Sequence, residues 1–484
     1  MAGITAYGGY IPRLRLSRKS MVDANSWANS ALKGQAKAER SMCNWDEDSL
    51  TMAVEAGRDC LTAQPRDSIA AVYLASTSLP FDDRLNAGIA VAALNLPGGV
   101  RTLDITASQR AGTSGLIAAL QAVAGEDGPL LYLAAEKRRA KGGSPLELSS
   151  GDGAAALLLG PGDGIARLLG SHSQAVDFID HYRGQGRQFD YVWEERWIRD
   201  EGYLKIVPPV LAALLEKTGV KASEIAHFCL PCTLGRVTPA IAKTLGIAEE
   251  AVRDNLHAAC GETGTAHALV MLVRALEESK PGEKILVAGF GQGCDALLFE
   301  TTAALKTLAP RLGIKGSLAR RKAETNYNKF LAFNDLVTVE KGMRAEVDKQ
   351  TALSTLYRKR DMLTGLIGGR CEKCGTVQFP KSNVCVNPNC NALHSQIDRP
   401  FAEMGGRVNS FTADLLTYCP DPPAHYGMVQ FAEGGRMMMD FTDVDTGSIE
   451  VGMPMRMVFR VKEYDPARGF TKYFWKAAPA AAQA

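Results

Sequence analysis

The chain has 484 residues, of which 46% are hydrophobic and 22% are charged, and its formal net charge is +2. This length and apolar content are sufficient for two to four domains with large cores. The small net charge gives no electrostatic footprint for nucleic acid, and no apolar run reaches the length needed to span a bilayer, so we expect neither partner.

Eleven cysteines are present, an odd number that does not suit complete disulfide pairing. The N-terminal stretch MAGITAYGGYIPRLRL does not show the pattern of a secretory signal, so we expect a cytoplasmic protein. In such a reducing compartment, metal ligands and free thiols are the better interpretation of the cysteines. Three basic clusters, RLRLSRK, EKRRAKGG and LARRK, are interpreted as solvated faces rather than phosphate sites.

Residues 1 to about 310 alternate short apolar runs with stretches of small residues, the pattern of an α/β domain with buried strands. The expected strands are 70–77, 100–106, 129–136, 154–160, 225–231, 284–290 and 295–301. GPLLYLAAEKR followed by GDGAAALLLG in the first half is similar to GEKILVAGFGQGCDALLFET in the second. This internal echo predicts a duplicated unit with a pseudo-twofold relation, with halves at 1–165 and 166–314.

The stretch DITASQRAGTSGLIAAL, residues 104–120, indicates a strand that turns sharply into a helix of small residues. Many enzymes present a nucleophile on such an elbow, yet its apex here is Ser108-Gln109-Arg110. An amide therefore occupies the place where a thiol or hydroxyl would be expected.

Residues 315–365 are more highly charged and indicate a helical linker or docking helix. The next segment, 366–397, holds two cysteine pairs on Gly- and Pro-containing turns, and this spacing predicts a tetrahedral structural zinc in a zinc ribbon. The four predicted ligands are Cys371, Cys374, Cys385 and Cys390, with His394 a less favoured substitute. A site of four sulfurs leaves no open coordination position, so we assign it to folding rather than catalysis.

Alternating segments within 398–476 predict a small antiparallel barrel, an OB-fold, followed by a disordered tail at 477–484. Aromatic residues in this region are candidates for base stacking, but without a basic surplus they suit a core or an interface better: Phe411, Tyr418, Tyr426 and Phe459.

Several motifs together resemble the thiolase superfamily, and within it the hydroxymethylglutaryl-CoA synthase branch. They are YGGYIPRLRL, DEDSLTMAVEA, VYLASTSLPF, AGTSGLIAAL, GDGAAALLLG and ACGETGTAHALVML. The tail from 325 to 476 is similar to the zinc-ribbon and OB-fold proteins that accompany thiolase-like enzymes, here fused to the chain. The resemblance implies a thiolase fold with a duplicated αβαβα core, acyl-CoA substrates with coenzyme A as substrate or product, and a homodimer formed through the core domain.

The chain departs from that family at four catalytic positions. The acyl-accepting cysteine corresponds to Gln109, the acid-base glutamate to Thr77, the histidine to Pro231 and the asparagine of the G-N-T turn to Glu262. An amide cannot form a thioester, so the resemblance implies chemistry other than a covalent acyl-cysteine cycle. Decarboxylating ketosynthase domains carry glutamine at the same place. Thiolase-like aldolases of steroid side-chain breakdown, which work with a zinc-ribbon and OB-fold partner, resemble this architecture.

A retro-aldol reaction needs a base for the β-hydroxyl and donors for the thioester enolate. Gln109 and the nearby main chain are the predicted donors at the helix N-terminus, although a polar filler of a vacated site is an equal alternative. Glu262 is the predicted base, with helix capping as its alternative. His257 is a candidate to orient the thioester or shuttle a proton, or else a structural histidine. Cys260 and Cys232 are candidate replacement nucleophiles, although a buried cysteine is usually a small hydrophobe.

The segment 181–203 occupies the place of a substrate-facing insertion of the family. Its aromatic residues are expected to line an acceptor pocket or a dimer contact: Tyr191, Trp193 and Trp197. Arg110, Arg183 and Arg187 are predicted to face the phosphates of coenzyme A, while Asp82 and Asp83 are further candidate acids or solvated loop charges.

The sequence therefore predicts a thiolase-superfamily enzyme, a carbon-carbon lyase or acyltransferase, that makes or breaks a bond at the β-carbon of an acyl-CoA. Two alternatives stay open. One is a hydroxymethylglutaryl-CoA synthase with a relocated nucleophile, and the other is a non-catalytic acyl-CoA-binding scaffold.

Overall fold

The computed structural model describes residues 2–125, 128–343 and 351–480. The chain divides into two compact units. The first comprises 1–43, 48–90 and 96–331, and the second comprises 44–47, 91–95 and 332–484.

A nine-stranded mixed sheet forms the framework of the first unit, in the order β11-β12-β13-β8-β1-β7-β6-β4-β5. Its strands are β1 (Ala2–Tyr10), β4 (Ala71–Ala75), β5 (Arg101–Ile105), β6 (Leu130–Lys137), β7 (Asp152–Pro161), β8 (Ala166–Ala175), β11 (Ile225–Cys229), β12 (Lys284–Phe290) and β13 (Gly293–Thr301). Only two residue pairs join β1 to β8. The sheet is therefore two groups of strands joined by a narrow seam.

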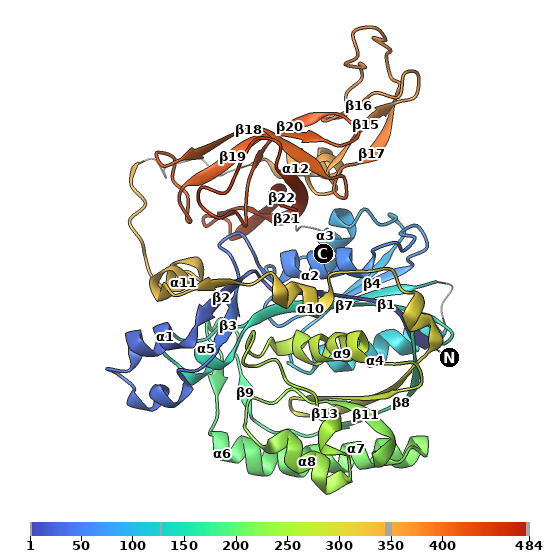
Figure 1. Ribbon diagram of the computed structural model, residues 1–484, viewed down its shortest axis with the longest axis vertical. Coiled ribbons are helices and arrows are strands. Elements are labelled where there is room, and N and C mark those ends of the chain that lie inside the picture. Colours follow the sequence, from blue (N-terminus) through green and yellow to red (C-terminus); the bar gives the residue numbers. More distant parts are fainter. Residues whose placement is uncertain (1, 126–127, 344–350, 481–484) are drawn as a thin grey trace. The chain divides into compact units, whose positions relative to one another are not determined.

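The helices of this unit are arranged in layers around the two groups of strands. Figure 1 shows α4 (Ala111–Ala124) and α9 (His267–Glu278) between them, with α7 (Leu204–Thr218) and α8 (Val237–Leu245) on the far side of the second group. The outer face of β1, β6 and β7 is covered by α2 (Ser49–Cys60). The small residues of α4 allow this central helix to lie against both strands and helix, so the predicted thiolase layering is confirmed.

The internal echo in the sequence corresponds to two equivalent strand pairs. β6 pairs antiparallel with β7, and β12 pairs antiparallel with β13. Each pair follows a buried central helix, α4 in the first half and α9 in the second. Most of the core side chains on these elements are aliphatic and fully buried. Strands that are buried on both faces have continuous apolar runs in the sequence, as seen here.

Further short elements belong wholly or mostly to the first unit. A three-stranded sheet joins β2 (Leu14–Ser17) to β3 (Glu39–Met42) and β14 (Lys322–Glu324). The helices are α1 (Arg18–Asn25), α3 (Asn86–Ala93), α5 (Pro145–Ser149), α6 (Glu195–Trp197), α10 (Gly313–Ala319) and α11 (Tyr327–Phe333). A π-helical turn at Ile198–Tyr203 leads into α7.

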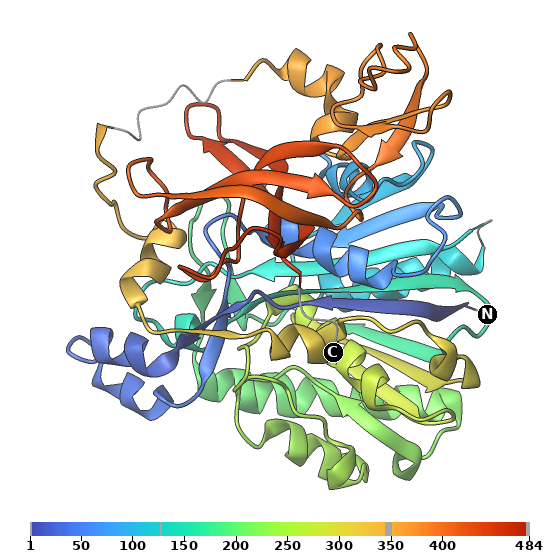
Figure 2. The same cartoon turned by 45° about the horizontal axis from the view of Figure 1, so that its top comes forward.

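The second unit contains a barrel sheet and a small ribbon (Figure 2). The barrel order is β20-β19-β18-β21-β22, and a bridge between Phe441 and Ala477 brings its two ends together. Its strands are β18 (Gly406–Asp414), β19 (Ala424–Phe431), β20 (Arg436–Asp440), β21 (Pro454–Asp465) and β22 (Phe470–Pro479). The ribbon consists of β15 (Ile367–Cys371), β16 (Val377–Gln378) and β17 (Gln396–Pro400), preceded by α12 (Leu353–Arg358) and α13 (Arg360–Leu363). The predicted zinc ribbon and OB-fold are confirmed.

Two of the expected segment boundaries differ from the observed elements. The linker at 315–365 is not wholly helical, because β14 pairs in parallel with β2, and part of it, 344–350, lies outside the described residues. The last barrel strand runs to Pro479, three residues beyond the expected end at 476, because residues 477–479 pair with the start of β21. Of the predicted tail, 481–484 lies outside the described residues.

Within the described ranges, none of the helices is long and apolar enough to cross a membrane. In the part of the chain that the structure describes, none of the eleven cysteines forms a disulfide bond.

Candidate active site

The elbow predicted at 104–120 is present between β5 and α4. Ala107 takes a left-handed conformation with φ of +76°, and the carbonyl of Ser108 accepts the N–H of Ala111 at 2.9 Å. A left-handed backbone conformation is uncommon for residues other than glycine, and here it marks a sharp change of chain direction. Gln109 is therefore held at the N-terminal end of α4, where unpaired main-chain N–H groups gather.

Gln109 lies between two groups of opposite charge. Its Nε2 donates to Glu262 Oε1 at 2.9 Å, and its Oε1 accepts from Arg138 Nη1 at 2.8 Å. A guanidinium only donates and a carboxylate only accepts, so these neighbours fix the orientation of the amide. Both charged partners are about 8% exposed, and the contacts are therefore largely removed from solvent.

Glu262 is held in place by main-chain contacts with the end of α5. Its N–H donates to the carbonyl of Ser149 at 2.9 Å, and its carbonyl accepts from Gly151 at 2.8 Å. A Cβ on Gly151 would lie 1.8 Å from the carbonyl oxygen of Cys260, so only glycine permits this approach. Close main-chain packing around Gly151 thus places the Glu262 carboxylate against the elbow.

A chain of ion pairs extends from Arg138. Its Nε lies 2.9 Å from Asp190 Oδ2, and Asp190 Oδ1 lies 2.6 Å from Arg183 Nη1. Arg183 also donates to the carbonyl of Thr77. Burial acts to lower the pKa of Arg138, but the carboxylates of Asp190 and Glu262, with two others, outweigh burial and raise it. The guanidinium is therefore a permanent charge beside Gln109.

A second buried carboxylate, Glu136, lies next to this chain. Its Oε2 accepts from Thr77 Oγ1 at 2.8 Å, from the Thr77 N–H at 3.1 Å and from Thr265 Oγ1 at 2.7 Å. Glu136 is fully buried. The threonine at position 77, where the family resemblance places a glutamate, thus binds a carboxylate that comes from the neighbouring strand β6.

Of the four positions that the family resemblance assigns to catalysis, three are joined through this network. Gln109 bonds Glu262 directly, and Thr77 is joined to Gln109 through Arg183, Asp190 and Arg138. Pro231 has a different contact: its carbonyl accepts from the Tyr203 hydroxyl at 3.1 Å.

His257 and Cys260 lie on the same loop as Glu262 but make other contacts. His257 Nε2 lies 3.0 Å from the carbonyl of Ser149, and burial is the largest cause that lowers its pKa to about 4. The ring is therefore neutral at neutral pH, which favours the structural interpretation. Burial raises the pKa of the Cys260 thiol to about 12, and the same cause raises that of Cys232 to about 12. Such thiols are poor nucleophiles.

The arginines expected to face coenzyme A have different surroundings. Arg110 donates to the carbonyl of Gln174 at 2.8 Å and lies 3.6 Å from Asp295. Arg183 belongs to the ion-pair chain, and Arg187 is exposed. Of the three, Arg187 is the most accessible to a phosphate.

The aromatic residues of segment 181–203 lie on the surface. Tyr191, Trp193 and Trp197 are each about half exposed, at 46%, 50% and 45%. Trp197 stacks on Phe178 with ring centroids 5.8 Å apart. Asp82 and Asp83 are exposed, as expected for solvated loop charges.

The interpretation of the basic clusters as solvated faces is wrong for three residues. Arg138 of EKRRAKGG is 8% exposed, and Arg15 and Arg18 of RLRLSRK are 1% and 7% exposed. Each side chain points into the first unit from a strand or from the end of one element. Arg15 and Arg18 donate to main-chain carbonyls, and Arg138 donates to Gln109 Oε1. A local run of charge does not report which member faces the interior.

Arg138, Glu136 and Asp190 were not predicted as site residues. One signal for the first two exists in the sequence, because they lie two residues apart at the end of the apolar run LLYLAAEKR. Opposite charges at that spacing on a buried strand share one face of the sheet. Asp190 belongs to a loop and has no such signal.

The four predicted zinc ligands form one cluster in the second unit. The sulfurs of Cys371, Cys374, Cys385 and Cys390 all lie within 4.8 Å of one another. The sulfurs of Cys371 and Cys390 are 3.9 Å apart, and those of Cys374 and Cys385 are 3.5 Å apart. Tetrahedral Zn–S bonds of about 2.3 Å place sulfurs about 3.8 Å apart. The donor set therefore fits a zinc ion, as predicted.

Tight turns and outer hydrogen bonds hold these sulfurs. Gly375, with φ of +74°, donates its N–H to the carbonyl of Cys371 at 2.8 Å. The hydroxyl of Ser395 lies 3.1 Å from the sulfur of Cys371. Such contacts orient metal ligands.

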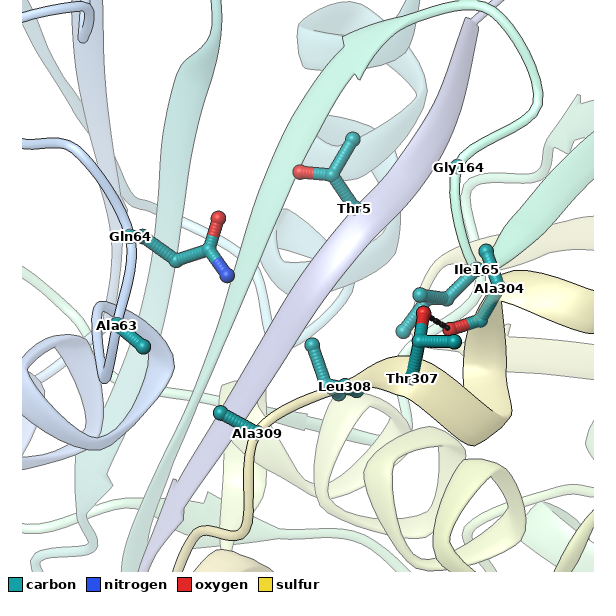
Figure 3. Close-up of a pocket in the computed structure, with 9 residues that line it drawn as sticks. All are labelled: Thr5, Ala63, Gln64, Gly164, Ile165, Ala304, Thr307, Leu308 and Ala309. Carbon is teal, nitrogen blue, oxygen red and sulfur yellow. Dashed lines mark hydrogen bonds between the residues drawn. The ribbon is translucent and has the colours of Figure 1, made fainter.

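The first unit also has a surface hollow with a volume of about 330 Å³, and its lining differs from that of the elbow (Figure 3). Its lining comes from β1, from the turn after α2 and from the segment after β13, and includes Thr5, Gln64 and Thr307. The nine lining residues contain no titratable side chain. This hollow therefore lacks the groups needed for acid-base chemistry.

Three family descriptions match parts of the chain. Residues 215–299 match the C-terminal part of 3-oxoacyl-[acyl-carrier-protein] synthase III, 365–392 match the rubredoxin-like zinc ribbon of ChsH2, and 401–460 match its C-terminal OB-fold domain. All three agree with the architecture described above.

Relatives with a curated name cover most of the first unit. The chain is 30% identical over 347 residues to a hydroxymethylglutaryl-CoA synthase from Aeropyrum pernix, an alignment that spans 70% of this chain and 96% of the relative. It is 31% identical over 316 residues to the same enzyme from Pyrobaculum neutrophilum, spanning 63% and 88% of the two chains.

Solved structures with the same fold include hydroxymethylglutaryl-CoA synthase complexed with CoA, at a TM-score of 0.57 and 18% identity, covering 82% of this chain and 99% of that one. The 3-oxoacyl-(acyl carrier protein) synthase III of Pseudomonas aeruginosa superimposes with a TM-score of 0.56 at 19% identity, covering 62% and 98%. The chain thus belongs to the hydroxymethylglutaryl-CoA synthase family of the thiolase superfamily, with a zinc ribbon and an OB-fold barrel at its C-terminal end.

Proposed function

We propose that this protein is an acyl-CoA enzyme that breaks or makes a carbon-carbon bond at the β-carbon through a CoA-thioester enolate, without an acyl-cysteine. Membership of a family of acyl-CoA condensing enzymes supports the substrate class. The observation that carries the proposal is the Gln109 amide bridging Arg138 and Glu262.

The amide is equipped to stabilise an enolate oxygen. A glutamine Nε2 carries two N–H groups, and Glu262 uses one of them. The positive charge of Arg138 on the amide oxygen polarises the group and makes the second N–H a stronger donor. The N-terminus of α4 adds a favourable dipole at the same place, which is the arrangement that stabilises developing negative charge.

In the cleavage direction, Glu262 takes the proton of the β-hydroxyl group. The bond between the α- and β-carbons breaks, its electron pair moves to the α-carbon, and the β-carbon leaves as a carbonyl compound. The enolate is stabilised by Gln109 and then accepts a proton at the α-carbon, which gives a shorter acyl-CoA. No bond to the protein forms in this sequence, so a thiol at the elbow is not required.

Zinc would stabilise the fold rather than enter this reaction, because four thiolates occupy all four coordination positions of a tetrahedral ion.

We also propose a homodimer. β5 is the terminal strand of the nine-stranded sheet, and Leu103 on it is 44% exposed, which leaves an edge suited to pairing with a second copy. Light scattering of the purified protein tests this, and a monomeric mass at micromolar concentration would contradict it.

The proposed reaction is tested by mass spectrometry of the full-length protein incubated separately with acetyl-, β-hydroxyacyl- and β-ketoacyl-CoA thioesters. We expect a shorter acyl-CoA from the β-hydroxyacyl substrates and no mass adduct on the protein. A stable acyl adduct mapped to Cys260 or Cys232 would instead establish a synthase with a relocated nucleophile. Tight CoA binding without any product would establish a scaffold.

A further inference from the structure

A histidine-aspartate pair lies at the start of the short β9–β10 hairpin, formed by His181–Tyr182 and Tyr191–Val192. His181 Nδ1 lies 2.8 Å from Asp180 Oδ2. Asp180 is 7% exposed, whereas the His181 side chain retains 18% of its accessible surface. The carboxylate is therefore buried behind an imidazole that still reaches accessible space.

The two faces of the hairpin differ. Tyr182 pairs with Tyr191 across the hairpin, their ring centroids are 5.3 Å apart, and both are about half exposed. Side chains alternate along an extended strand, so the side chain of His181 lies on the opposite face from that of Tyr182. Arg183, the residue after β9, binds the carbonyl of Thr77 and the carboxylate of Asp190, so this end of the hairpin is held against the elbow network.

Further contacts fix the hairpin against the elbow. The N–H of Asp190 donates to the carbonyl of Arg139 at 2.9 Å, and Asp190 pairs with Arg138, which binds Gln109. Electrostatics give a second indication of proximity. Burial raises the pKa of the Tyr203 phenol well above its usual value, and the charges of both Glu262 and Asp180 raise it further. Asp180 and Glu262 therefore act on the same buried group.

A carboxylate that accepts from Nδ1 fixes the tautomer and orientation of a histidine. The Nε2 atom is then available to give or take a proton. The position at which the family resemblance places a catalytic histidine is Pro231, so this chain needs another group if the enolate is to be protonated inside the site.

We propose that His181, oriented by Asp180, is a catalytic residue that exchanges the proton at the α-carbon of the acyl-CoA enolate. This inference rests on the proposed function. In the cleavage direction, imidazolium Nε2–H transfers its proton to the α-carbon, the enolate electron pair forms the new C–H bond, and the histidine becomes neutral. Glu262, which holds the β-hydroxyl proton, returns that proton to His181 through solvent, so the cycle is balanced.

The test uses the full-length protein in D₂O and follows deuterium incorporation at the α-carbon of acetyl-CoA and propionyl-CoA by mass spectrometry. Wild type is expected to exchange these hydrogens, and His181→Gln is expected to lose about 100-fold or more of the exchange rate. His172→Gln on β8 is the matched control and is expected to stay within about threefold of wild type, since proton-transfer effects of 10² or more are confined to groups at the reacting atoms.

Two additional variants separate catalysis from folding. Imidazole added to His181→Ala is expected to restore exchange, because a merely structural loss is not repaired by a soluble base. Asp180→Asn is expected to lower exchange about tenfold in the wild-type background and to have no further effect in His181→Gln, since a positioning residue acts through its partner at a fraction of the full acid-base effect.

The possible outcomes distinguish the role of His181 from the proposed function on which it rests. Wild-type exchange rates in His181→Gln, together with cleavage of a β-hydroxyacyl-CoA, would overturn the role of His181 and leave the proposed function standing. Absence of both exchange and cleavage in the wild type would overturn both. If His181→Gln fails to fold, an absence of imidazole rescue in a folded His181→Ala would overturn the inference.

Discussion

Replacement of Glu262 by glutamine tests the assignment of the base most directly. The glutamine side chain has almost the same shape, and its carbonyl oxygen is able to accept the bond that Gln109 Nε2 now donates at 2.9 Å. The geometry of the elbow should therefore persist. What the variant loses is the negative charge and the ability to take a proton.

The structure allows the two consequences to be estimated separately. A positioned general base contributes about 10²- to 10⁴-fold in rate, which corresponds to about 3–5 kcal/mol in the barrier. Stability should change by only about 1 kcal/mol, because Arg138 keeps its ion pair with Asp190 at 2.9 Å and the hydrogen bond to Gln109 is replaced. We therefore expect a folded protein that binds CoA normally and turns over at least 100-fold more slowly, in line with the acid-base contribution.

The assay is steady-state cleavage of a β-hydroxyacyl-CoA, with CoA affinity measured by calorimetry on the same preparations. Glu194→Gln, at an exposed position, is the matched control and should match wild type in both measurements. A kcat for Glu262→Gln within about threefold of wild type would refute the assignment of Glu262 as the base, since such a group contributes at least 10²-fold. A parallel loss of CoA binding would show that the substitution disturbs the site instead of its chemistry.

Three further predictions concern stability. Cys371→Ser removes one of four zinc ligands and should lower zinc content measured by atomic absorption and destabilise the second unit, and unchanged zinc would contradict the structural assignment. In the wild type, the folded pKa of His257 is about 4 and the unfolded pKa is 6.5, so between these values the unfolded state binds more protons and the free energy of unfolding falls as the pH drops. His257→Gln should remove this dependence. Urea titrations should show that the decrease in the free energy of unfolding between pH 6.5 and 4 is smaller in the variant by up to about 3 kcal/mol. Lys476→Met should cost about 3 kcal/mol, because it removes the partner at 2.8 Å from the buried Asp46 and leaves that carboxylate with the Arg460 Nε at 3.7 Å. A loss below about 1 kcal/mol in the same titration would contradict this.

Much of the fold was predictable because the relevant signals are local. The strand, turn and small-residue helix around Gln109 follow from a run of seventeen residues, and the zinc cluster follows from the spacing of four cysteines. These features depend on chain geometry that neighbouring residues decide.

The ion-pair chain was not predictable in the same way, because its members are far apart in the sequence. Gln109, Arg138 and Asp190 meet only through the packing of β6 and the 181–192 hairpin against the elbow. A charged residue in a basic run has the same local pattern whether it faces water or a buried carboxylate. The sequence therefore identified Gln109 and Glu262 as candidates but gave no partner for either.

The network also bears on whether the glutamine is a filler in a vacated site. A polar filler needs only to occupy the volume and satisfy its own hydrogen bonds, and its neighbours would not depend on it. Here the amide oxygen faces a guanidinium and the amide nitrogen faces a carboxylate, both about 8% exposed. Loss of the amide alone would leave two largely buried charges without these contacts, at about 1–3 kcal/mol for each. Positions 109, 138 and 262 thus depend on one another, which is the property expected of a polar site built around an amide.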